Sequence, residues 1–285
     1  KPKNNQSKLI LEETQPISGK NILGEFKLIH NGNIPNIEAD DSISDSHTLV
    51  KYIENYKIDT DVNDINNSKT KREIWLTILK NLLLEFKKAY CLIIMTIDEL
   101  YILRDIYGVR PLCIGYNESG WCVASESAAF MDKYNFIRDV EPGEIIRMNC
   151  NGIKTLYKHH IDSESPSIQS RCLFEYIYFL SENSYADNHQ VSKLRYSFGC
   201  LLAEQDIEKG SVLNDVLVVG SPSTGIPSGK GYADTLGLQY RQVLKKNVNI
   251  GRTFILENNK KRDNACKKKY YLDVDLIQGR KIVIV

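Results

Sequence analysis

The sequence lacks a surplus of charge of either sign, because 37 Lys and Arg residues nearly balance 36 Asp and Glu residues and leave a net charge of +1. Without a basic surplus, no overall field attracts nucleic acid or an anionic membrane surface. Long apolar runs are also missing, since no stretch approaches the ~20 residues of a membrane span. No signal or transit sequence is recognisable. We therefore expect a cytoplasmic protein whose partners include neither nucleic acid nor a membrane.

Paired cysteines are missing as well. The cysteines number seven and form no C-x-x-C motif, which is not the pattern of a disulfide framework or of a zinc site. We interpret them as reduced thiols that lie mostly in the core: Cys91, Cys113, Cys122, Cys150, Cys172, Cys200 and Cys266.

The arrangement of apolar residues predicts two domains, for which 285 residues suffice. Short apolar strands and hairpin turns alternate over residues 26–160, and this pattern predicts a largely antiparallel β domain with helices packed on it. Residues 158–170 are typical of a linker. The continuous apolar strand Val216–Val219 is typical of a parallel sheet, with further strands expected at 252–255 and 281–285. The chain starts at Lys1 and stops at an apolar β run, so we expect a fragment of a longer protein.

The segment His30–Asn33 follows an apolar run, and its Asn-Gly pair predicts a tight turn. Backbone N–H groups that point outward from such a turn can stabilise a developing negative charge. Taken alone, Asn-Gly more often forms a plain hairpin turn. Downstream, Ser44-Asp45-Ser46 leads into an apolar helical face, with Asp45 or Ser46 as the expected N-cap.

Four motifs follow one another in the first half of the chain: His30–Asn33, Ser44–Ser46, Asp105-x-x-Gly108-x-Arg110-Pro111-Leu112 and Ala124–Ser127. Together they resemble the glutaminase domain of amidotransferases that use an N-terminal cysteine nucleophile, which has an Ntn-hydrolase fold. The resemblance implies that Asn31 and Gly32 form the oxyanion hole and that Asp45 binds the α-amino group of glutamine. Without the order of motifs, Asp45 would be interpreted as a helix cap. We interpret Asp105, Arg110 and Glu126 as structural turn and cap residues.

The sequence departs from this glutaminase family at the nucleophile. In the family, the nucleophilic cysteine is the first residue of the mature chain, but no cysteine precedes Cys91 here. An Arg-Tyr-Ser/Thr motif of the family is also missing. We expect the segment that carries both features to be absent from this chain.

The second half resembles amidophosphoribosyltransferases in Asp139–Glu144, in Cys172–Phe179 and, most specifically, in Lys246-Asn247-x-x-Ile250-Gly251-Arg252-Thr253-Phe254-Ile255. In that family the last segment belongs to a flexible loop that closes over phosphoribosyl pyrophosphate. The resemblance therefore implies substrate contacts from Lys246, Asn247 and Arg252.

The loop Gly220–Gly225 follows an apolar strand, at the edge where parallel sheets bind ligands. By resemblance, Thr224 would lie at the magnesium–pyrophosphate site, although Ser223 stands where the family has an acidic residue. Cys172 matches a ligand of a 4Fe-4S cluster in some members, and we favour a buried structural thiol there. We interpret the basic runs 260–262 and 267–269 as a solvated loop.

These resemblances predict an α+β Ntn-hydrolase-type glutaminase domain over residues 1–165, without its N-terminal part, and a truncated α/β type I phosphoribosyltransferase domain over residues 166–285. The implied reaction is the glutamine-dependent amination of phosphoribosyl pyrophosphate to 5-phosphoribosylamine, the first committed step of purine nucleotide synthesis. Mg²⁺, purine nucleotides as feedback inhibitors and a homo-oligomeric assembly are implied with it. Two alternatives stay open: another glutaminase-bearing enzyme, such as an asparagine or glucosamine-phosphate synthase, and an inactive homologue that acts as a partner or regulatory subunit.

Overall fold

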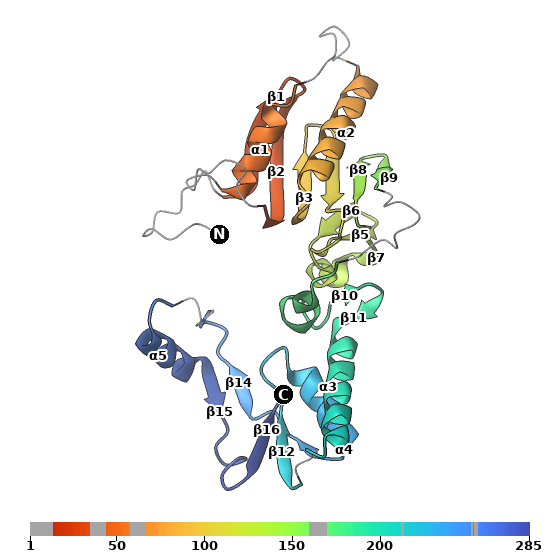
Figure 1. Cartoon of the computed structure of the whole chain (residues 1–285). Helices are drawn as coiled ribbons and strands as arrows, with labels where there is room; N and C mark the ends of the chain where they lie inside the picture. The colour runs from red at the N-terminus through yellow and green to blue at the C-terminus, as the bar shows by residue number, and fades with distance from the viewer. Residues whose placement is uncertain are drawn as a thin grey trace. The chain divides into compact units, whose positions relative to one another are not determined.

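A computed structural model describes residues 14–34, 44–57, 67–159, 170–211, 214–251, 253 and 256–285. The chain divides into two compact units, residues 1–175 and 176–285, whose elements are labelled in Figure 1. The expected domain boundary between residues 165 and 166 lies outside the described residues, as do Arg252 and most of the strand expected at 252–255.

A six-stranded antiparallel sheet dominates the first unit, with the strand order β1-β2-β3-β4-β8-β9. These strands span Ile17–Asn21, Gly24–Asn33, Ala89–Met95, Leu100–Arg104, Glu144–Asn149 and Gly152–Lys158. A smaller antiparallel sheet has the order β6-β5-β7, with strands Gly120–Ala124, Cys113–Asn117 and Asn135–Asp139. The 3-10 helix η3, Ser127–Lys133, follows β6. The expected antiparallel β structure of this region is thus confirmed.

The larger sheet separates two apolar clusters. The alternating side chains of β2 place Phe26 and Leu28 on the face that is covered by the helices α1 (Asp45–Glu54) and α2 (Ser68–Glu85), where they join buried residues of both helices. Cys91 and Ile102 lie on the opposite face and pack with Ile114 of the smaller sheet. The first unit therefore has three layers: helices, large sheet and small sheet.

The tight turn predicted at Asn31–Gly32 is wrong. Both residues belong to β2, where Asn31 is the register partner of Cys91 and Gly32 that of Tyr90. Glycine is required here by close backbone approach, because a Cβ atom on Gly32 would lie 2.4 Å from the Ala89 carbonyl oxygen and 2.6 Å from Tyr90 Cα. Glycine is therefore needed at position 32 because a strand distant in the sequence approaches its backbone closely, and not because a turn requires it.

The N-cap predicted for α1 is also wrong by one or two residues. Ser44 caps the helix, since its hydroxyl accepts a hydrogen bond from the His47 backbone N–H at 3.4 Å. Asp45 is instead the first helical residue. Its carboxylate does not cap α1 and accepts a hydrogen bond from the Ile34 N–H, just after β2.

The second unit contains a parallel three-stranded sheet, as expected from its apolar strand. The strand order is β13-β12-β16, with bounds Gln239–Tyr240, Val216–Val219 and Lys281–Ile284. Helices α3 (Val191–Glu208) and α4 (Ile226–Leu236) contribute Ala203, Tyr232 and Ala233 to a core with Val218. The short strands β10 (Tyr185–Ala186) and β11 (His189–Gln190) form a hairpin, and the π-helix η4 spans Glu175–Phe179.

An antiparallel ribbon completes the second unit. It pairs β14 (Leu244–Lys246) with β15 (Tyr270–Leu272), and helix α5 (Asn259–Lys269) precedes β15. Except for the half-buried Lys269, the basic runs 260–262 and 267–269 are exposed, as expected, but they lie in α5 and not in a loop.

Candidate functional site

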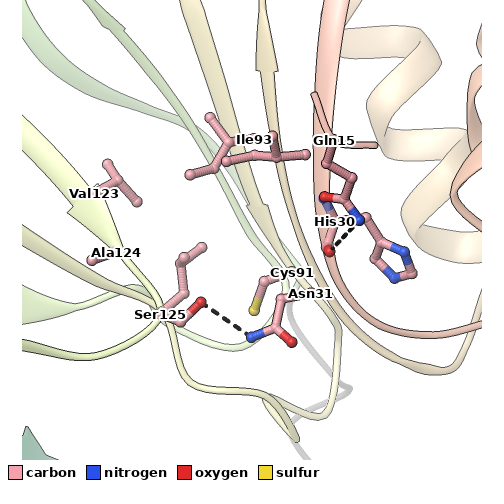
Figure 2. Close-up of a pocket in the computed structure, with 10 residues that line it drawn as sticks. Gln15, His30, Asn31, Cys91, Ile93, Val123, Ala124 and Ser125 are labelled. Carbon is pink, nitrogen blue, oxygen red and sulfur yellow. Dashed lines mark hydrogen bonds between the residues drawn. The ribbon is translucent and has the colours of Figure 1, made fainter. Parts of the chain in front are cut away.

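A cleft of about 310 Å³ lies in the first unit, beside the C-terminal end of β2 (Figure 2). Residues of β2, β3 and the end of β6 contribute to it. Its lining consists of Gln15, Ile29, His30, Asn31, Cys91, Ile93, Leu112, Val123, Ala124 and Ser125. The cleft is mostly apolar, so its few polar groups determine what it can bind.

Asn31 supplies a polar group at the end of this cleft. Because Phe26 and Leu28 face the helices, strand alternation directs Ile29 and Asn31 to the opposite face of the sheet. The Asn31 side chain Nδ2 donates a hydrogen bond to the Ser125 hydroxyl at 3.1 Å (Figure 2). Gly32, the other expected oxyanion residue, is not among the lining residues and lies within the sheet.

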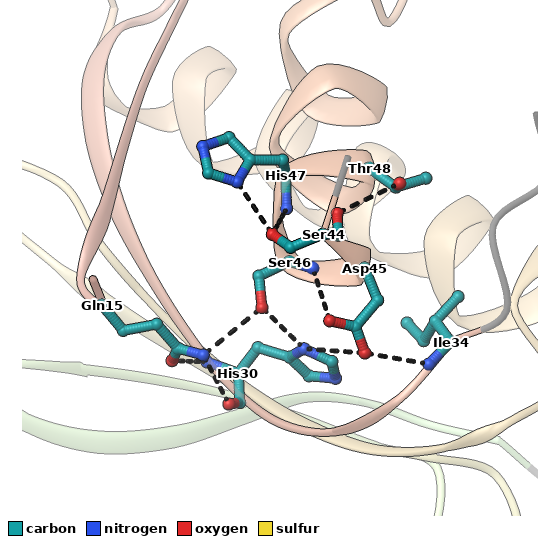
Figure 3. A network of polar contacts seen from close by, with 8 residues as sticks. All are labelled: Gln15, His30, Ile34, Ser44, Asp45, Ser46, His47 and Thr48. Atoms are coloured by element: carbon teal, nitrogen blue, oxygen red, sulfur yellow. Dashed lines mark hydrogen bonds and ion pairs between the residues drawn. The ribbon is translucent and has the colours of Figure 1, made fainter. Parts of the chain in front are cut away.

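The Gln15 side chain is hydrogen-bonded to the backbone of His30, the residue before Asn31. The His30 backbone N–H donates to Gln15 Oε1 at 2.6 Å, and Gln15 Nε2 donates to the His30 carbonyl at 3.0 Å (Figure 3). The same Nε2 lies 3.3 Å from the Ser46 hydroxyl. One side-chain amide therefore contacts both the end of β2 and the first turn of α1.

The His30 imidazole is buried between β2 and α1, with 2% of its side chain exposed. Its Nδ1 lies 3.0 Å from the Ser46 hydroxyl and 3.9 Å from Asp45 Oδ2 (Figure 3). Burial lowers the pKa of His30, and the nearby Asp45 carboxylate opposes this shift only in part. Nε2 is buried and has no hydrogen-bond partner within the described segments. The ring is thus favoured in its neutral form.

Asp45 is anchored next to the end of β2 and does not line the cleft. Its Oδ2 accepts a hydrogen bond from the Ile34 N–H at 3.3 Å, and its Oδ1 accepts one from the Ser46 N–H at 3.0 Å. About a quarter of its side chain is exposed, 24%, so a cationic group can still reach it. The structure brings Asn31 and Asp45 to the same strand end, joined through His30.

Cys91 is the cysteine that lines the cleft, but it is 3% exposed. Its Sγ points at the carbonyl oxygens of Arg110 and Pro111, at 3.5 and 3.7 Å. Burial raises the pKa of the Cys91 thiol far above its usual range. Since the thiolate is the nucleophilic form, Cys91 is not suited to attack a substrate.

The residues interpreted as structural hold the turn beside the cleft. Asp105 accepts hydrogen bonds from the N–H groups of Tyr107 at 2.9 Å and Val109 at 3.1 Å. Arg110 forms an ion pair of 2.6 Å with the buried Glu175. Both positions therefore stabilise the loop that carries Leu112 into the cleft wall.

In the second unit, Thr224 lies in the loop between β12 and α4. The Ser221 N–H donates to the Val285 carbonyl at 2.7 Å, which joins this loop to the residue after β16, and the Gly225 N–H donates to the Ser221 carbonyl at 2.8 Å. The N-terminus of α4 follows directly, and a helix N-terminus favours anions. The loop residues 220–225 offer three hydroxyls and no carboxylate, a donor set that suits phosphate better than a bare metal ion.

Lys246 and Asn247 lie at the end of the β14–β15 ribbon. Lys246 is exposed, while the Asn247 N–H donates to the Lys269 carbonyl at 2.7 Å and its Oδ1 accepts from the Asn249 N–H at 3.1 Å. Within the described part of the second unit, no hydrogen bond joins them to Thr224. Arg252 lies outside that part.

Metal ligands do not gather anywhere in the described ranges, which contain no group of three or more His, Cys, Asp or Glu side chains able to hold an ion. Cys172 is half-buried and belongs to no such group. Four cysteines are the usual ligands of an iron–sulfur cluster, so the described residues do not fit one. Among these residues, no helix has the length and apolar character that crossing a membrane requires.

The sequence alone assigned no role at the site to Gln15, nor to His30, Ser46 and Ser125, although these last three stand in its motifs. The β1–β2 register, continued by two residues beyond Ile17 and Leu28, places Gln15 opposite His30, but this register is known from the structure and not from a local pattern. Ser125 stands in the motif Ala124–Ser127, but its contact with Asn31, 94 residues away along the chain, had no signal in the sequence.

Comparisons with known proteins connect this geometry to one group of enzymes. No family model matches the chain. The amidophosphoribosyltransferase of Rattus norvegicus is 30% identical over 302 residues, covering 96% of this chain and 56% of the rat protein. That of Mycobacterium tuberculosis (strain H37Rv) is 34% identical over 206 residues, covering 72% of this chain and 37% of its own length.

The structural comparison agrees. The glutamine phosphoribosylpyrophosphate amidotransferase from B. subtilis, solved with ADP and GMP, superposes with a TM-score of 0.75 at 30% identity, covering 99% of this chain and 59% of that one. The chain thus spans little more than half the length of the rat and B. subtilis proteins. Over nearly its whole length, the chain is a homologue of the amidophosphoribosyltransferases.

Proposed function

We propose that this protein catalyses the glutamine-dependent amination of phosphoribosyl pyrophosphate to 5-phosphoribosylamine, the first committed step of purine nucleotide synthesis. The observation that carries the proposal is the similarity to amidophosphoribosyltransferases over 96% of the chain. In this proposal, residues 1–165 form an Ntn-hydrolase-type glutaminase domain and residues 166–285 belong to a type I phosphoribosyltransferase domain. The three-layered first unit and the parallel sheet of the second support these assignments.

In the glutaminase half, a cysteine thiolate attacks the amide carbon of glutamine, and the carbonyl oxygen becomes an oxyanion. When the carbonyl re-forms, the C–N bond breaks and the nitrogen takes up a proton and leaves as ammonia. Water then hydrolyses the thioester to glutamate and restores the thiol. An amide nitrogen carries two hydrogens, so the bond from Asn31 to Ser125 leaves one for this oxyanion. Residues two apart in a strand direct their N–H groups to the same side, so Gly32 N–H faces the edge that His30 N–H faces. Because β1 begins only opposite Leu28, the β1–β2 pairing does not extend to Gly32. This supports the Gly32 N–H as a second donor to the oxyanion.

Asp45 would hold the α-amino group of glutamine by a charge-assisted hydrogen bond. Its partial exposure and its fixed carboxylate support this role. The nucleophile is assigned to none of the seven cysteines of this chain. For Cys91, the one at the cleft, burial opposes thiolate formation.

In the transferase half, ammonia attacks the anomeric carbon, a C–N bond forms, the C–O bond to pyrophosphate breaks, and the surplus proton passes to solvent. The hydroxyls beside Thr224 and the N-terminus of α4 would bind the pyrophosphate group. Mg²⁺ prefers oxygen ligands and binds largely through substrate phosphates, which fits a loop without carboxylates. When bound, it would neutralise the charge of the leaving group. Lys246, Asn247 and Arg252 would contact the substrate from the ribbon and the loop after it.

Regulation and assembly are proposed by analogy. The B. subtilis enzyme was solved with ADP and GMP, and we propose that purine nucleotides inhibit this protein. A homo-oligomeric state and a cytoplasmic location stay predictions. The described residues do not fit an iron–sulfur cluster, so no role is assigned to one.

The test uses the encoded full-length protein. Release of pyrophosphate from phosphoribosyl pyrophosphate is measured with glutamine or with ammonium as the nitrogen source, and glutamate is measured in parallel. We expect activity with both sources. Asn31→Ala should lower glutamine-dependent turnover by ~10²–10³-fold, while ammonia-dependent turnover persists. Asn33→Ala, an exposed neighbour at the end of the same strand, is the matched control.

Two outcomes separate the alternatives. Pyrophosphate release with neither nitrogen source would refute the proposed enzyme and support an inactive homologue. Release with ammonium alone would refute the glutaminase half and retain the transferase half.

A further inference from the structure

Beyond the last residue that pairs with β1, a side chain forms the hydrogen bonds at the edge of β2. The β1–β2 ladder begins with Ile17 opposite Leu28, and the residue before Ile17 is Pro16, which has no backbone N–H to offer. At the position opposite His30, the Gln15 side-chain amide takes the place of a backbone peptide. It accepts from the His30 N–H at 2.6 Å and donates to the His30 carbonyl at 3.0 Å, the exchange of two bonds that an antiparallel strand partner makes.

The same amide reaches the helix that carries Asp45. Gln15 Nε2 lies 3.3 Å from the Ser46 hydroxyl, which in turn lies 3.0 Å from His30 Nδ1. The Ser46 N–H donates to the Asp45 carboxylate at 3.0 Å. Gln15 therefore connects the strand end that presents Asn31 with the helix turn that presents Asp45 (Figure 3).

We propose that Gln15 is a positioning residue for glutamine hydrolysis, which fixes the Asn31 and Asp45 groups relative to each other by clamping the backbone of His30. The proposal rests on the glutaminase activity proposed above. Its amide hydrogen bonds go to His30 and Ser46, so it acts through these residues. Without the clamp, the His30 peptide groups turn to water and the strand end opens locally. A displacement of about 1 Å in a group that orients the reaction costs on the order of 10²-fold in rate.

Two substitutions separate the clamp from general packing. Gln15→Glu keeps the size and one acceptor for the His30 N–H, but it directs a carboxylate oxygen at the His30 carbonyl and the Ser46 hydroxyl. Gln15→Ala removes the clamp. Gln205→Glu and Gln205→Ala, at an exposed position of α3 in the second unit, are the matched controls.

In the full-length protein, we expect both Gln15 variants to lower kcat for glutamine hydrolysis at least tenfold. Ammonia-dependent activity should stay within twofold of the wild type. In the same proteins, amide hydrogen exchange at residues 30–32 should be faster in Gln15→Ala than in Gln205→Ala, with no change in strands β4 and β8.

The outcomes are distinguishable. If the wild type does not hydrolyse glutamine, the proposed function fails and this proposal with it. If the wild type is active and Gln15→Glu retains its kcat within twofold, the positioning role alone is refuted. Equal loss of glutamine- and ammonia-dependent activity, or unchanged exchange at residues 30–32 in Gln15→Ala, also refutes it.

Discussion

Replacing Gly32 with alanine should destabilise the first unit by ~2–3 kcal/mol, the upper part of the range for overpacking. The new Cβ would lie 2.4 Å from the Ala89 carbonyl oxygen and 2.6 Å from both Cα and Cβ of Tyr90, whereas real Cβ contacts essentially never fall below 3.0 Å. The strands must therefore separate by at least the difference, ~0.6 Å at the Ala89 oxygen. Tyr90 is fully buried in the core, so no flexible side chain can absorb this movement.

Tryptophan fluorescence can measure the stability of the first unit selectively. Trp75 and Trp121 both lie in the first unit, so tryptophan fluorescence during urea or thermal unfolding reports on that unit. A shift of ~2–4 °C per kcal/mol applies to units of this size, which gives an expected decrease in Tm of ~4–12 °C. Asn33→Ala, exposed at the end of the same strand, should change the free energy of unfolding by no more than ~0.5 kcal/mol. Equal midpoints for the two variants would refute the close approach of β3 to Gly32.

Two further predictions concern titratable groups at the cleft. Burial lowers the pKa of folded His30 below 6.5, and Asp45 opposes this shift in part. The unfolded state therefore binds the proton more readily. As a result, the free energy of unfolding should fall as pH drops from about 6.5 toward the folded pKa. Urea titrations between about pH 5 and 7.5 should show a smaller decline for His30→Asn, and an unchanged decline would contradict this origin. Thiol labelling of the native protein should modify the exposed Cys150 and Cys266 and spare Cys91 until unfolding, because burial raises the pKa of the Cys91 thiol. Peptide mass spectrometry measures this, and labelling of Cys91 as fast as Cys150 would show that its thiol is accessible.

The parts of the fold with a strong local pattern could be predicted from the sequence. Alternation and turn residues indicated the antiparallel hairpins, and the uninterrupted apolar run Val216–Val219 indicated a parallel strand. Hydrophobic patterns report burial directly, so these elements need no knowledge of distant partners. The same holds for the exposed basic runs, although charge alone did not distinguish helix α5 from a loop.

The errors fall where a distant segment determines the local structure. Asn-Gly favours a turn by its own preference, but the pairing of Gly32 with Tyr90 keeps it in a strand. Asn31 was expected at the site by resemblance and does line the cleft, whereas its contact with Ser125 crosses 94 residues. Side-chain networks of this kind depend on tertiary packing, which periodicity does not encode.

The pairing of β2 with β3 also determines when the cleft can form. The last register partners of this pair are Asn33 and Ala89. They close a loop of ~55 residues that contains helices α1 and α2. The entropic cost of closing such a loop grows only slowly, by ~0.6 kcal/mol for each doubling of its length. The ends of this loop are fixed by the sheet, so insertions or deletions between the two helices change the rate and entropy of closure more than the geometry of the cleft. During synthesis, the cleft cannot be completed before residue 125 has left the ribosome, although strands β8 and β9 of the same sheet are made later still.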